Sequence, residues 1–351
     1  MYNINVVSLR MQHHAGPSGY DKLLENLEVN VIAPRVPAGF GVRSLIKLMA
    51  RITKNSGSFW YHRQNMHMEL LAAQSWLSSN SQIYHFLYGE NSYRYLGNLK
   101  SFLPRDNKII CSYHTPTWRM KEVVKDRKHI EKLDAIAVVS TVQSDFFSEL
   151  IGPERVYFVP HGVDTDYFTP GATELVARPD RIRFVTVGHH LRDFNTLAAV
   201  AKQVGRTFPE VEFIVVARAD RMDVLRNLSN VKCLSGISDE DLKMLYCTSS
   251  ALFLPLEDAT ANNSLLEAMA CGLPIISTDI AGVRDYVPEQ NVLLCARHDT
   301  ESCLNAVLQV CEESVDLNVM GKASRMAALR FSWPLVSKQM NELYSRVAIC
   351  S

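Results

Sequence analysis

The stretch ATANNSLLEAMACGLP, residues 259–274, gathers amides, a hydroxyl and a carboxylate around the predicted start of a short helix. An apolar strand and a polar loop precede the helix, and a Gly and a Pro end it. The first amides of a helix have no partner inside it, and the helix dipole adds partial positive charge there. The amides of Asn263, Ser264 and Leu265 are therefore predicted to bind an anion such as a diphosphate.

Glu267, within the same stretch, has two interpretations. Ser264 and Glu267 have the spacing of a capping box, in which the two side chains satisfy the helix's own amides and no ligand is needed. A carboxylate that accepts two hydroxyl hydrogen bonds also suits a diol. The spacing alone favours neither interpretation.

Polar residues follow the strands of the first half of the chain too. In HHAGPSGYDKL, Gly16 and Gly19 permit close backbone approach and Ser18 can cap the next helix, although the spacing does not match GxGxxG and an ordinary turn is the alternative. His114 ends the strand in IICSYHTP, where an imidazole can bind a ligand hydroxyl or be a buried structural residue. His85, in IYHFLYGENSY, is expected to be structural.

The loop GHHLRDFNTL, residues 188–197, offers a cation after a strand. The guanidinium of Arg192 suits phosphate oxygens, and the alternative is a surface ion pair with Asp193. His189 and His190 add donors, but adjacent side chains seldom converge on one metal ion.

Two series of short apolar runs predict an α/β fold. The first comprises INVVSL, VNVIAP, QIYHFLY, KIICSYH, AIAVVS and VYFVP, and the second, after about residue 180, comprises IRFVTVG, VEFIVVA, VKCLSG, ALFLPL, LPIIST and NVLLC. Apolar strands separated by helical patterns indicate two doubly wound, Rossmann-like domains with parallel sheets. The series break in VPHGVDTDYFTPGATELVARPD. We expect domains at 1–163 and 164–331, a final helix at 332–351, and an active site in a cleft between the domains.

Composition excludes several classes of protein. The 351 residues carry 37 basic and 37 acidic side chains, so no global field attracts nucleic acid. The eight cysteines are scattered without a CxxC pair, and we interpret them as reduced core residues of a cytoplasmic protein. The opening MYNINVVSL lacks the pattern of a signal peptide, and no apolar run approaches ~20 residues, so neither a signal peptide nor a membrane span is expected.

Several motifs together resemble a known family. LLEAMACGLPIIST resembles the signature of the retaining glycosyltransferases of the GT-B fold, in the large family (glycosyltransferase family 4, group 1) that includes sucrose synthases and mannosyltransferases. VPHGVDTDYFTP resembles the interdomain segment of that family, FVTVGHH its first donor-domain strand and loop, and CLSGISDEDLKMLY its base-binding turn. FSWPLVSKQMNELY resembles the segment that returns to the first domain. The five matches occur in the order that the family has.

The resemblance implies roles for individual residues. The catalytic residues it implies are His114, Arg192 and Asn262. The donor-binding residues it implies are Gly16, Ser18, Gly19, His189, Ile237, Asn263, Ser264, Leu265 and Glu267. Glu267 would hold the ribose hydroxyls as the second glutamate of a Glu, seven residues, Glu motif.

The first glutamate of that motif is missing, because position 259 is Ala259. Two hypotheses remain for what binds the sugar hydroxyls in place of this glutamate. In one, a loop carboxylate approaches, from Asp258 or Glu257; in the other, the neutral amides of Asn262 and Asn263 bind them. The alternative is that the two acidic side chains are only solvated loop charges.

The resemblance implies a metal-independent, retaining hexosyltransferase. It would move a sugar from a UDP or GDP sugar to an acceptor hydroxyl on a glycan, a glycolipid or a small molecule, without a further cofactor. Alternatives are an epimerase or hydrolase of the same fold, or a non-catalytic subunit, which Ala259 favours. The triplet at 164–166, Asp-Thr-Asp, resembles a metal-binding DxD motif but lies in a Pro-bounded hinge, so we reject a metal role for it.

FGVRSLIKLMARITK, residues 40–54, predicts a basic amphipathic helix. Leu45, Leu48, Met49 and Ile52 share one face, and the basic side chains line a neighbouring face: Arg43, Lys47 and Arg51. Such a helix can lie in an anionic membrane surface, which would give a cytoplasmic protein peripheral contact with the inner face of a membrane and access to a lipid-linked acceptor. The alternatives are a helix packed on the core with a solvated basic edge, or one that binds an acidic acceptor.

Overall fold

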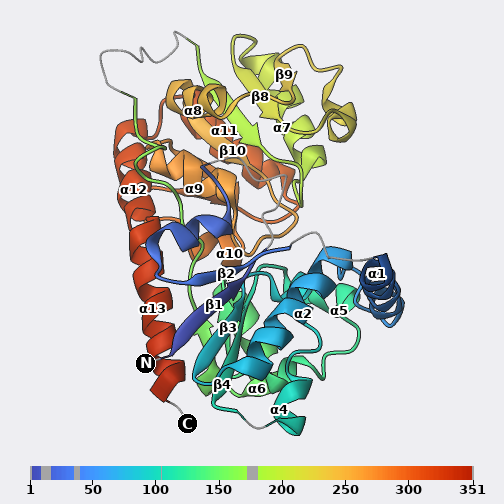
Figure 1. Ribbon diagram of the computed structural model, residues 1–351. Coiled ribbons are helices and arrows are strands. Elements are labelled where there is room, and N and C mark those ends of the chain that lie inside the picture. The colour runs from blue at the N-terminus through green and yellow to red at the C-terminus, as the bar shows by residue number, and fades with distance from the viewer. Residues whose placement is uncertain (1, 9–16, 35–39, 104, 172–180, 350–351) are drawn as a thin grey trace. The chain divides into compact units, whose positions relative to one another are not determined.

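The structure, a computed structural model, describes residues 2–8, 17–34, 40–103, 105–171 and 181–349. The chain divides into two compact units, each with its own sheet (Figure 1). The described residues of Met1–His14, Tyr20–His161 and Pro334–Ser351 belong to unit 1. Those of Ala15–Gly19 and Gly162–Trp333 belong to unit 2, so the short loop 17–19 groups with the later part of the chain.

Unit 1 contains a six-stranded parallel sheet in the order β2-β1-β3-β4-β5-β6. Its strands are β1 (Asn3–Val7), β2 (Asn30–Ile32), β3 (Gln82–Phe86), β4 (Asn107–Tyr113), β5 (Ala135–Val138) and β6 (Val156–Phe158). The central strands β3 and β4 are buried almost throughout, as expected for strands that are covered on both faces.

Helices cover both faces of this sheet. The helices of unit 1 are α1 (Phe40–Asn55), α2 (Arg63–Ser78), α3 (Gly89–Ser92), α4 (Asn98–Phe102), α5 (Thr117–Val123), α6 (Ser144–Ile151) and most of α13 (Trp333–Ile349). Side chains of α2, α5 and α6 share a buried cluster with Tyr84 and Phe86 of β3. Successive strand residues point to opposite faces, so His85 points the other way, and its Nδ1 lies 2.7 Å from the Tyr344 hydroxyl of α13.

Unit 2 contains a second six-stranded parallel sheet, in the order β12-β11-β10-β7-β8-β9. Its strands are β7 (Arg183–Val187), β8 (Glu212–Val216), β9 (Val231–Leu234), β10 (Ala251–Leu254), β11 (Ile275–Thr278) and β12 (Leu293–Cys295). Its helices are α7 (Phe194–Thr207), α8 (Asp239–Thr248), α9 (Asn263–Ala270), α10 (Ala281–Arg284), α11 (Thr300–Cys311) and α12 (Leu317–Leu329).

Two buried clusters cover the faces of the unit 2 sheet. One includes side chains of α7 and α11, and the other includes side chains of α8, α9 and α12. All twelve strands expected from the sequence are present, and the predicted pair of doubly wound α/β units is confirmed.

Short 3₁₀ helices complete the connections, at Tyr20–Asn26, Ile130–Lys132, Thr141–Gln143, Pro153–Arg155, Ala219–Arg221 and Asp223–Leu225. None of the described helices combines the length and the apolar character needed to cross a bilayer.

Candidate functional site

The strand order of unit 2 reverses between β7 and β10, and the predicted site residues lie in the loops that follow these two strands. Open α/β sheets bind ligands at such a switch point, beyond the carboxyl ends of the strands. The two loops are joined by backbone hydrogen bonds, from Asp193 N to Pro255 O at 3.0 Å and from Glu257 N to Leu191 O at 2.9 Å. Gly188 begins the first loop with φ +90°, which a side chain would strain.

Arg192 places its guanidinium at the start of α9. Its Nε and Nη2 donate to the Val187 carbonyl at 3.0 and 2.9 Å, and Nη1 donates to the His190 carbonyl at 2.8 Å. Nη2 also lies 2.8 Å from Ser264 Oγ and 3.2 Å from Asn262 Oδ1. The structure therefore brings three of the predicted site residues together.

The guanidinium of Arg192, a half-buried residue, has no carboxylate partner among the described residues. Burial lowers its pKa to about 10, so it remains protonated at neutral pH. Among the described residues, no carboxylate lies within ion-pair distance of Arg192. A cation that is partly withdrawn from water is stabilised by a neighbouring anion, which makes this a suitable position for a phosphate.

The surface ion pair between Arg192 and Asp193 is not formed. Asp193 instead caps α7, accepting from Thr196 N at 2.9 Å and from Thr196 Oγ1 at 2.7 Å. His298 Nδ1 lies 3.4 Å from the same carboxylate. The alternative interpretation of Arg192 is thus wrong, because the helix cap occupies its proposed partner.

The start of α9 is capped by Asn262 and not by Ser264. Asn262 Oδ1 accepts from Leu265 N at 3.2 Å, while Ser264 Oγ lies 2.7 Å from that oxygen and 3.1 Å from the Val187 carbonyl. Helix geometry leaves the amides of Asn263 and Ser264 without acceptors inside the helix. The capping box of Ser264 and Glu267 is therefore absent, because Ser264 lies one residue inside the helix and not at its cap.

Glu267 is 4% exposed and binds two hydroxyl groups. Its carboxylate accepts a hydrogen bond from the Ser18 hydroxyl and another from the Tyr246 hydroxyl at 2.9 Å. Burial raises the pKa of Glu267 and outweighs the opposite effect of both hydrogen bonds. Paired hydroxyl donors on one carboxylate are the same chemistry that a ribose diol offers.

Two further predicted donor residues of unit 2, His189 and Ile237, are half-buried. His189 is half-buried, and burial and then the charges of Arg218 and Arg192 lower its pKa. Ile237 is half-buried in the turn after β9, beside Gly236 with φ +67°.

The predicted glycine loop is only partly described. Gly19 is buried with φ +152°, a conformation that favours glycine, and Ser18 is the residue that contacts Glu267. Gly16 lies outside the described residues.

Ala259 is buried in the core of unit 2 at 6% exposed. Its carbonyl lies 2.0 Å from where a Cβ of Gly282 would be, so the two backbones approach closely. Asp258 Oδ1 accepts from Ala259 N at 2.8 Å, and Glu257 Oε2 lies 3.4 Å from His298 Nε2. Glu257 and Asp258 therefore have partners within the chain and are not only solvated loop charges.

One set of side chains has the spacing of metal ligands. Ligand atoms of Asp193, Glu257 and His298 lie within 4.8 Å of one another. Asp193 Oδ1 and Oδ2 already accept hydrogen bonds from Thr196 in capping α7, and the His298 ring nitrogens lie 3.4 Å from Asp193 Oδ2 and 3.4 Å from Glu257 Oε2, so these contacts connect three loops. Asp164 of the rejected triplet accepts from the amides of Asp166 and Tyr167 at 3.1 and 2.8 Å, which is a local turn.

His114 belongs to unit 1, at the end of β4. Its ring Nε2 lies 2.8 Å from the Leu87 carbonyl, and its ring packs edge-on against Tyr20 with centroids 4.4 Å apart. His85, by contrast, is fully buried between Tyr344 and Ser112, and burial lowers its pKa to about 3, which supports its structural interpretation.

Glu90 is a candidate that the sequence analysis missed. Glu90 Oε1 accepts from His114 N at 3.2 Å and from Thr115 Oγ1 at 2.9 Å, while Oε2 has no partner among the described residues. Burial raises its pKa to about 7. Its position just after β3 was the available signal. Tyr246, also missed, had no such signal, because its contact with Glu267 depends on the packing of α8 on α9.

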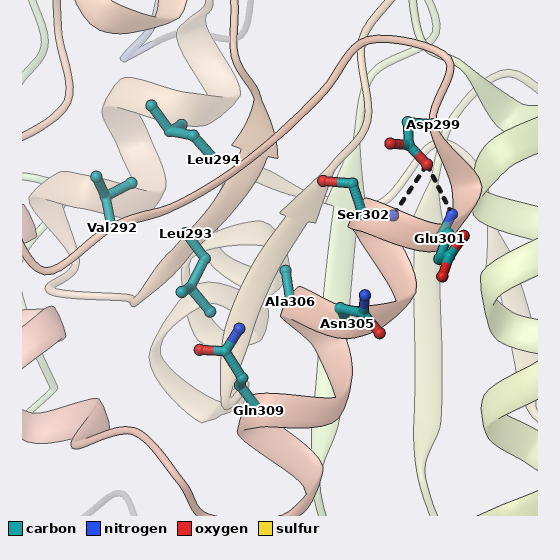
Figure 2. A pocket seen from close by; sticks show the side chains of 9 residues that line it. All are labelled: Val292, Leu293, Leu294, Asp299, Glu301, Ser302, Asn305, Ala306 and Gln309. Carbon is teal, nitrogen blue, oxygen red and sulfur yellow. Dashed lines mark hydrogen bonds between the residues drawn. The ribbon is translucent and has the colours of Figure 1, made fainter.

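A hollow of about 510 Å³ lies between β12 and α11, away from these residues (Figure 2). Its lining includes Leu293, Asn305 and Gln309, and Asp299 beside it accepts from the amides of Glu301 and Ser302 at 3.0 Å each. None of the predicted site residues lines this hollow, and of its two lining carboxylates Asp299 caps α11 while Glu301 lies in the first turn of that helix.

Comparison with known proteins identifies this region. Residues 181–313 match the family model described as Glycosyl transferases group 1. This part of unit 2 is a group 1 glycosyl transferase domain. The matched range contains Arg192, the start of α9 and Glu267, whereas Ser18 and His114 lie outside it.

Relatives and solved structures extend the likeness beyond the glycosyl transferase domain. The chain is 26% identical over 212 residues to a phosphatidylinositol N-acetylglucosaminyltransferase chain of Arabidopsis thaliana, covering 57% of this chain and 46% of that protein. It is 24% identical over 264 residues to D-inositol 3-phosphate glycosyltransferase of Saccharomonospora viridis, covering 68% and 61%. The chain thus spans about half to three fifths of the length of these relatives.

The sucrose-phosphate synthase of Thermosynechococcus elongatus superposes with a TM-score of 0.72 at 18% identity, covering 100% of both chains. An α,α-trehalose-phosphate synthase of Burkholderia vietnamiensis gives 0.72 at 14% identity, covering 100% and 98%. These likenesses confirm the predicted GT-B fold class, with the glycosyl transferase domain as its second unit.

Proposed function

We propose that this protein is a retaining, metal-independent glycosyltransferase that moves a hexose from a UDP or GDP sugar to an acceptor hydroxyl. The observation that carries the proposal is the half-buried Arg192, whose guanidinium lies beside the first amides of α9, with the buried Glu267 carboxylate one turn further along the helix. A cation and helix amides suit a diphosphate, and a carboxylate suits a ribose diol.

The proposed reaction is a transfer on one face of the sugar. The acceptor oxygen bonds to the anomeric carbon as the bond to the diphosphate breaks, and the departing phosphate oxygen takes the acceptor proton. Arg192 and the amides of Asn263 and Ser264 would stabilise the charge that grows on that oxygen. No nucleophile from the protein is required, so the absence of a glutamate at position 259 does not preclude the reaction.

A lipid-linked acceptor is part of the proposal. The names of two relatives refer to phosphatidylinositol and to inositol 3-phosphate, which supports a polyol acceptor. Helix α1 supports membrane contact, because Leu45, Leu48 and Ile52 are 56–57% exposed while Ile46 and Ala50 on another face are buried. The core therefore packs against a different face from the one that carries these exposed side chains.

A vesicle experiment tests membrane contact at the cytoplasmic face. The protein should sediment with vesicles that contain anionic lipid, less so as salt rises. The combined change Arg43→Gln, Lys47→Gln and Arg51→Gln should abolish sedimentation and leave the affinity for the nucleotide unchanged. If the unchanged protein does not bind such vesicles at low salt, the acceptor is not reached through α1.

A second candidate function is a non-catalytic subunit, favoured by Ala259. Release of nucleoside diphosphate from a panel of donor sugars, with and without acceptor, separates the candidates. Release that requires acceptor supports the transferase, release without acceptor supports a hydrolase, and donor binding without release supports the non-catalytic role. Activity that survives a chelator supports metal independence, whereas loss restored by a divalent cation would contradict it.

A further inference from the structure

Hydroxyl groups of the chain itself contact both carboxylate oxygens of Glu267. Oε1 accepts a hydrogen bond from the Ser18 hydroxyl, and Oε2 accepts one from the Tyr246 hydroxyl at 2.9 Å. Two hydroxyl groups on one carboxylate are also what a ribose diol supplies. The chain therefore presents to Glu267 the same kind of donors that the proposed nucleotide would present.

The two hydroxyl groups differ in how firmly the structure holds them. Tyr246 is 1% exposed and belongs to the buried core cluster that α8 and α9 share. Ser18 is half-buried and lies outside any helix or strand, two residues before the 3₁₀ helix Tyr20–Asn26. Its neighbour Gly19 has φ +152°, which favours glycine. Ser18 is thus the partner of Glu267 that can move away, whereas the core fixes the Tyr246 hydroxyl.

A nucleotide bound at the start of α9 would meet the Ser18 hydroxyl. Ser264, whose Oγ lies 2.8 Å from Arg192 Nη2, precedes Glu267 by three residues, which is about 4.5 Å along a helix. This distance is comparable with the step from the diphosphate of a nucleotide to its ribose. Glu267 is only 4% exposed, so ribose hydroxyls reach its carboxylate only if Ser18 moves.

We propose that Ser18 is an internal competitor for the ribose site, whose hydroxyl binds Glu267 until the ribose of a nucleoside diphosphate displaces it. The exchange replaces one hydroxyl hydrogen bond to the carboxylate by another, so releasing Ser18 offsets part of the gain from binding ribose. The proposal rests on the proposed function, because it takes Glu267 as the residue that binds ribose. It differs from the direct donor contact that the sequence resemblance implies for Ser18.

Ser18→Ala tests the exchange, because it removes the competing hydroxyl and retains a small side chain. We expect the affinity for the better-bound of UDP and GDP to rise about tenfold in a calorimetric titration, since a hydrogen bond to a charged group no longer has to be broken. Without nucleotide, the same variant should have a lower melting temperature, because Glu267 has lost a partner. Ser18→Thr keeps a hydroxyl and should reverse most of the gain in affinity.

Tyr246→Phe is the matched variant at the other carboxylate oxygen. It also removes a hydroxyl from Glu267, but the ring still fills its place in the core, so we expect no gain in nucleotide affinity. The matched ligand is the 2′,3′-dideoxy diphosphate of the same base. It has no ribose hydroxyl for Glu267, so Ser18→Ala should leave its affinity unchanged.

The outcomes separate this inference from the proposed function. If Ser18→Ala binds the nucleotide as the unchanged protein does, or more weakly, Ser18 does not compete, and a weaker affinity would favour direct contact with the donor. An equal gain for the dideoxy diphosphate would also overturn the exchange, since that gain would not come from Glu267. In both cases nucleotide binding itself still supports the proposed function.

Binding of neither UDP nor GDP to the unchanged protein and to Ser18→Ala would contradict the proposed function and the exchange together. An unchanged melting temperature of Ser18→Ala without nucleotide would overturn the exchange alone, because the contact with Glu267 would then have no energetic weight. Should Ser18→Ala fail to fold, Ser18→Gly removes the same hydroxyl at this half-buried position and takes its place in each measurement.

Discussion

The carboxyl edges of the two sheets carry ionisable groups of opposite type, one basic and one acidic. In unit 2 this edge holds the Arg192 guanidinium, and in unit 1 it holds the Glu90 carboxyl beneath the backbone of His114. Burial lowers the pKa of Arg192 to about 10 and raises that of Glu90 to about 7, so at neutral pH the first stays charged while the second is partly neutral. Two sheets of the same architecture thus differ at their carboxyl edges: the edge in unit 2 suits an anion, and the edge in unit 1 suits uncharged hydroxyl groups. The side chains after the strands, and not the fold, make that difference.

Arg192→Ala should have the largest effect, because it removes the cation from the anion edge. We expect turnover to fall about 100- to 1000-fold, as on loss of a donor to a developing oxyanion, and Arg192→Lys to lose less. The control is Arg206→Ala, an exposed arginine in the last turn of α7, which should leave turnover unchanged. Steady-state kinetics at subsaturating donor measure the difference, and equal rates for Arg192→Ala and Arg206→Ala would refute the role.

Glu267→Ala should weaken nucleotide binding about 10- to 100-fold, and Glu267→Gln should weaken it less, because the amide keeps one acceptor oxygen. Tyr246→Phe serves as the matched variant, since it removes one partner hydroxyl of Glu267 and keeps the ring. Calorimetric titration and thermal unfolding separate the two roles. Unchanged affinity with a lowered melting temperature in the Glu267 variants would leave Glu267 as a structural residue only.

The free energy of unfolding should depend on pH through the Glu90 carboxyl. A carboxyl whose folded pKa is about 7 against an ordinary 4.5 holds its proton better in the folded state, so it contributes stability below about pH 4.5 that is lost as pH rises towards 7. The change is about 3 kcal/mol at most. His85 and His129, with pKa values lowered to about 3, act in the opposite direction between pH 3 and 6.5.

Comparing the stability of the unchanged protein with that of Glu90→Gln separates the contribution of the Glu90 carboxyl from that of the histidines, which both proteins share. Urea unfolding at pH 5 and pH 7.5 should show that the unchanged protein loses more stability than Glu90→Gln does over this interval. If both lose the same amount, Glu90 does not titrate as its burial implies.

Ala259→Glu should have the smallest effect on transfer. The position is buried against the core, so an added carboxylate should lower the melting temperature by about 2–4 °C per kcal/mol lost and give no gain in activity. Asn262→Ala should lower activity on the native donor, because it removes the cap of α9. A protein that is inactive until Ala259→Glu is introduced would instead have the non-catalytic role.

Local patterns were sufficient for the fold and for part of the site. Apolar runs bounded by loops predicted every strand, and a cation after β7 and a polar turn before α9 predicted the partners Arg192 and Ser264. These features depend on residues that are close in the sequence. Hydrophobic periodicity and the residue types of turns therefore predict them.

Contacts between distant segments could not be predicted in the same way. Ser18 and Glu267 are 249 residues apart, and Tyr246 reaches Glu267 only because α8 packs on α9. The capping-box interpretation would place the cap of α9 at Ser264, whereas Asn262 caps it, and the residue types alone do not decide because Asn and Ser cap equally well. The position of Ser264 between Arg192 and the Val187 carbonyl decides between them, and that position is a product of packing.

The central claim is that Arg192 and the start of α9 bind the diphosphate of a nucleotide. Calorimetric titration of UDP and GDP, each beside its nucleoside without phosphate, tests it on the unchanged protein, Arg192→Ala and Arg206→Ala. The account predicts that one diphosphate binds the unchanged protein and Arg206→Ala alike and binds Arg192→Ala at least about tenfold more weakly, while the nucleoside does not distinguish the three. Equal diphosphate affinity in all three proteins would contradict it.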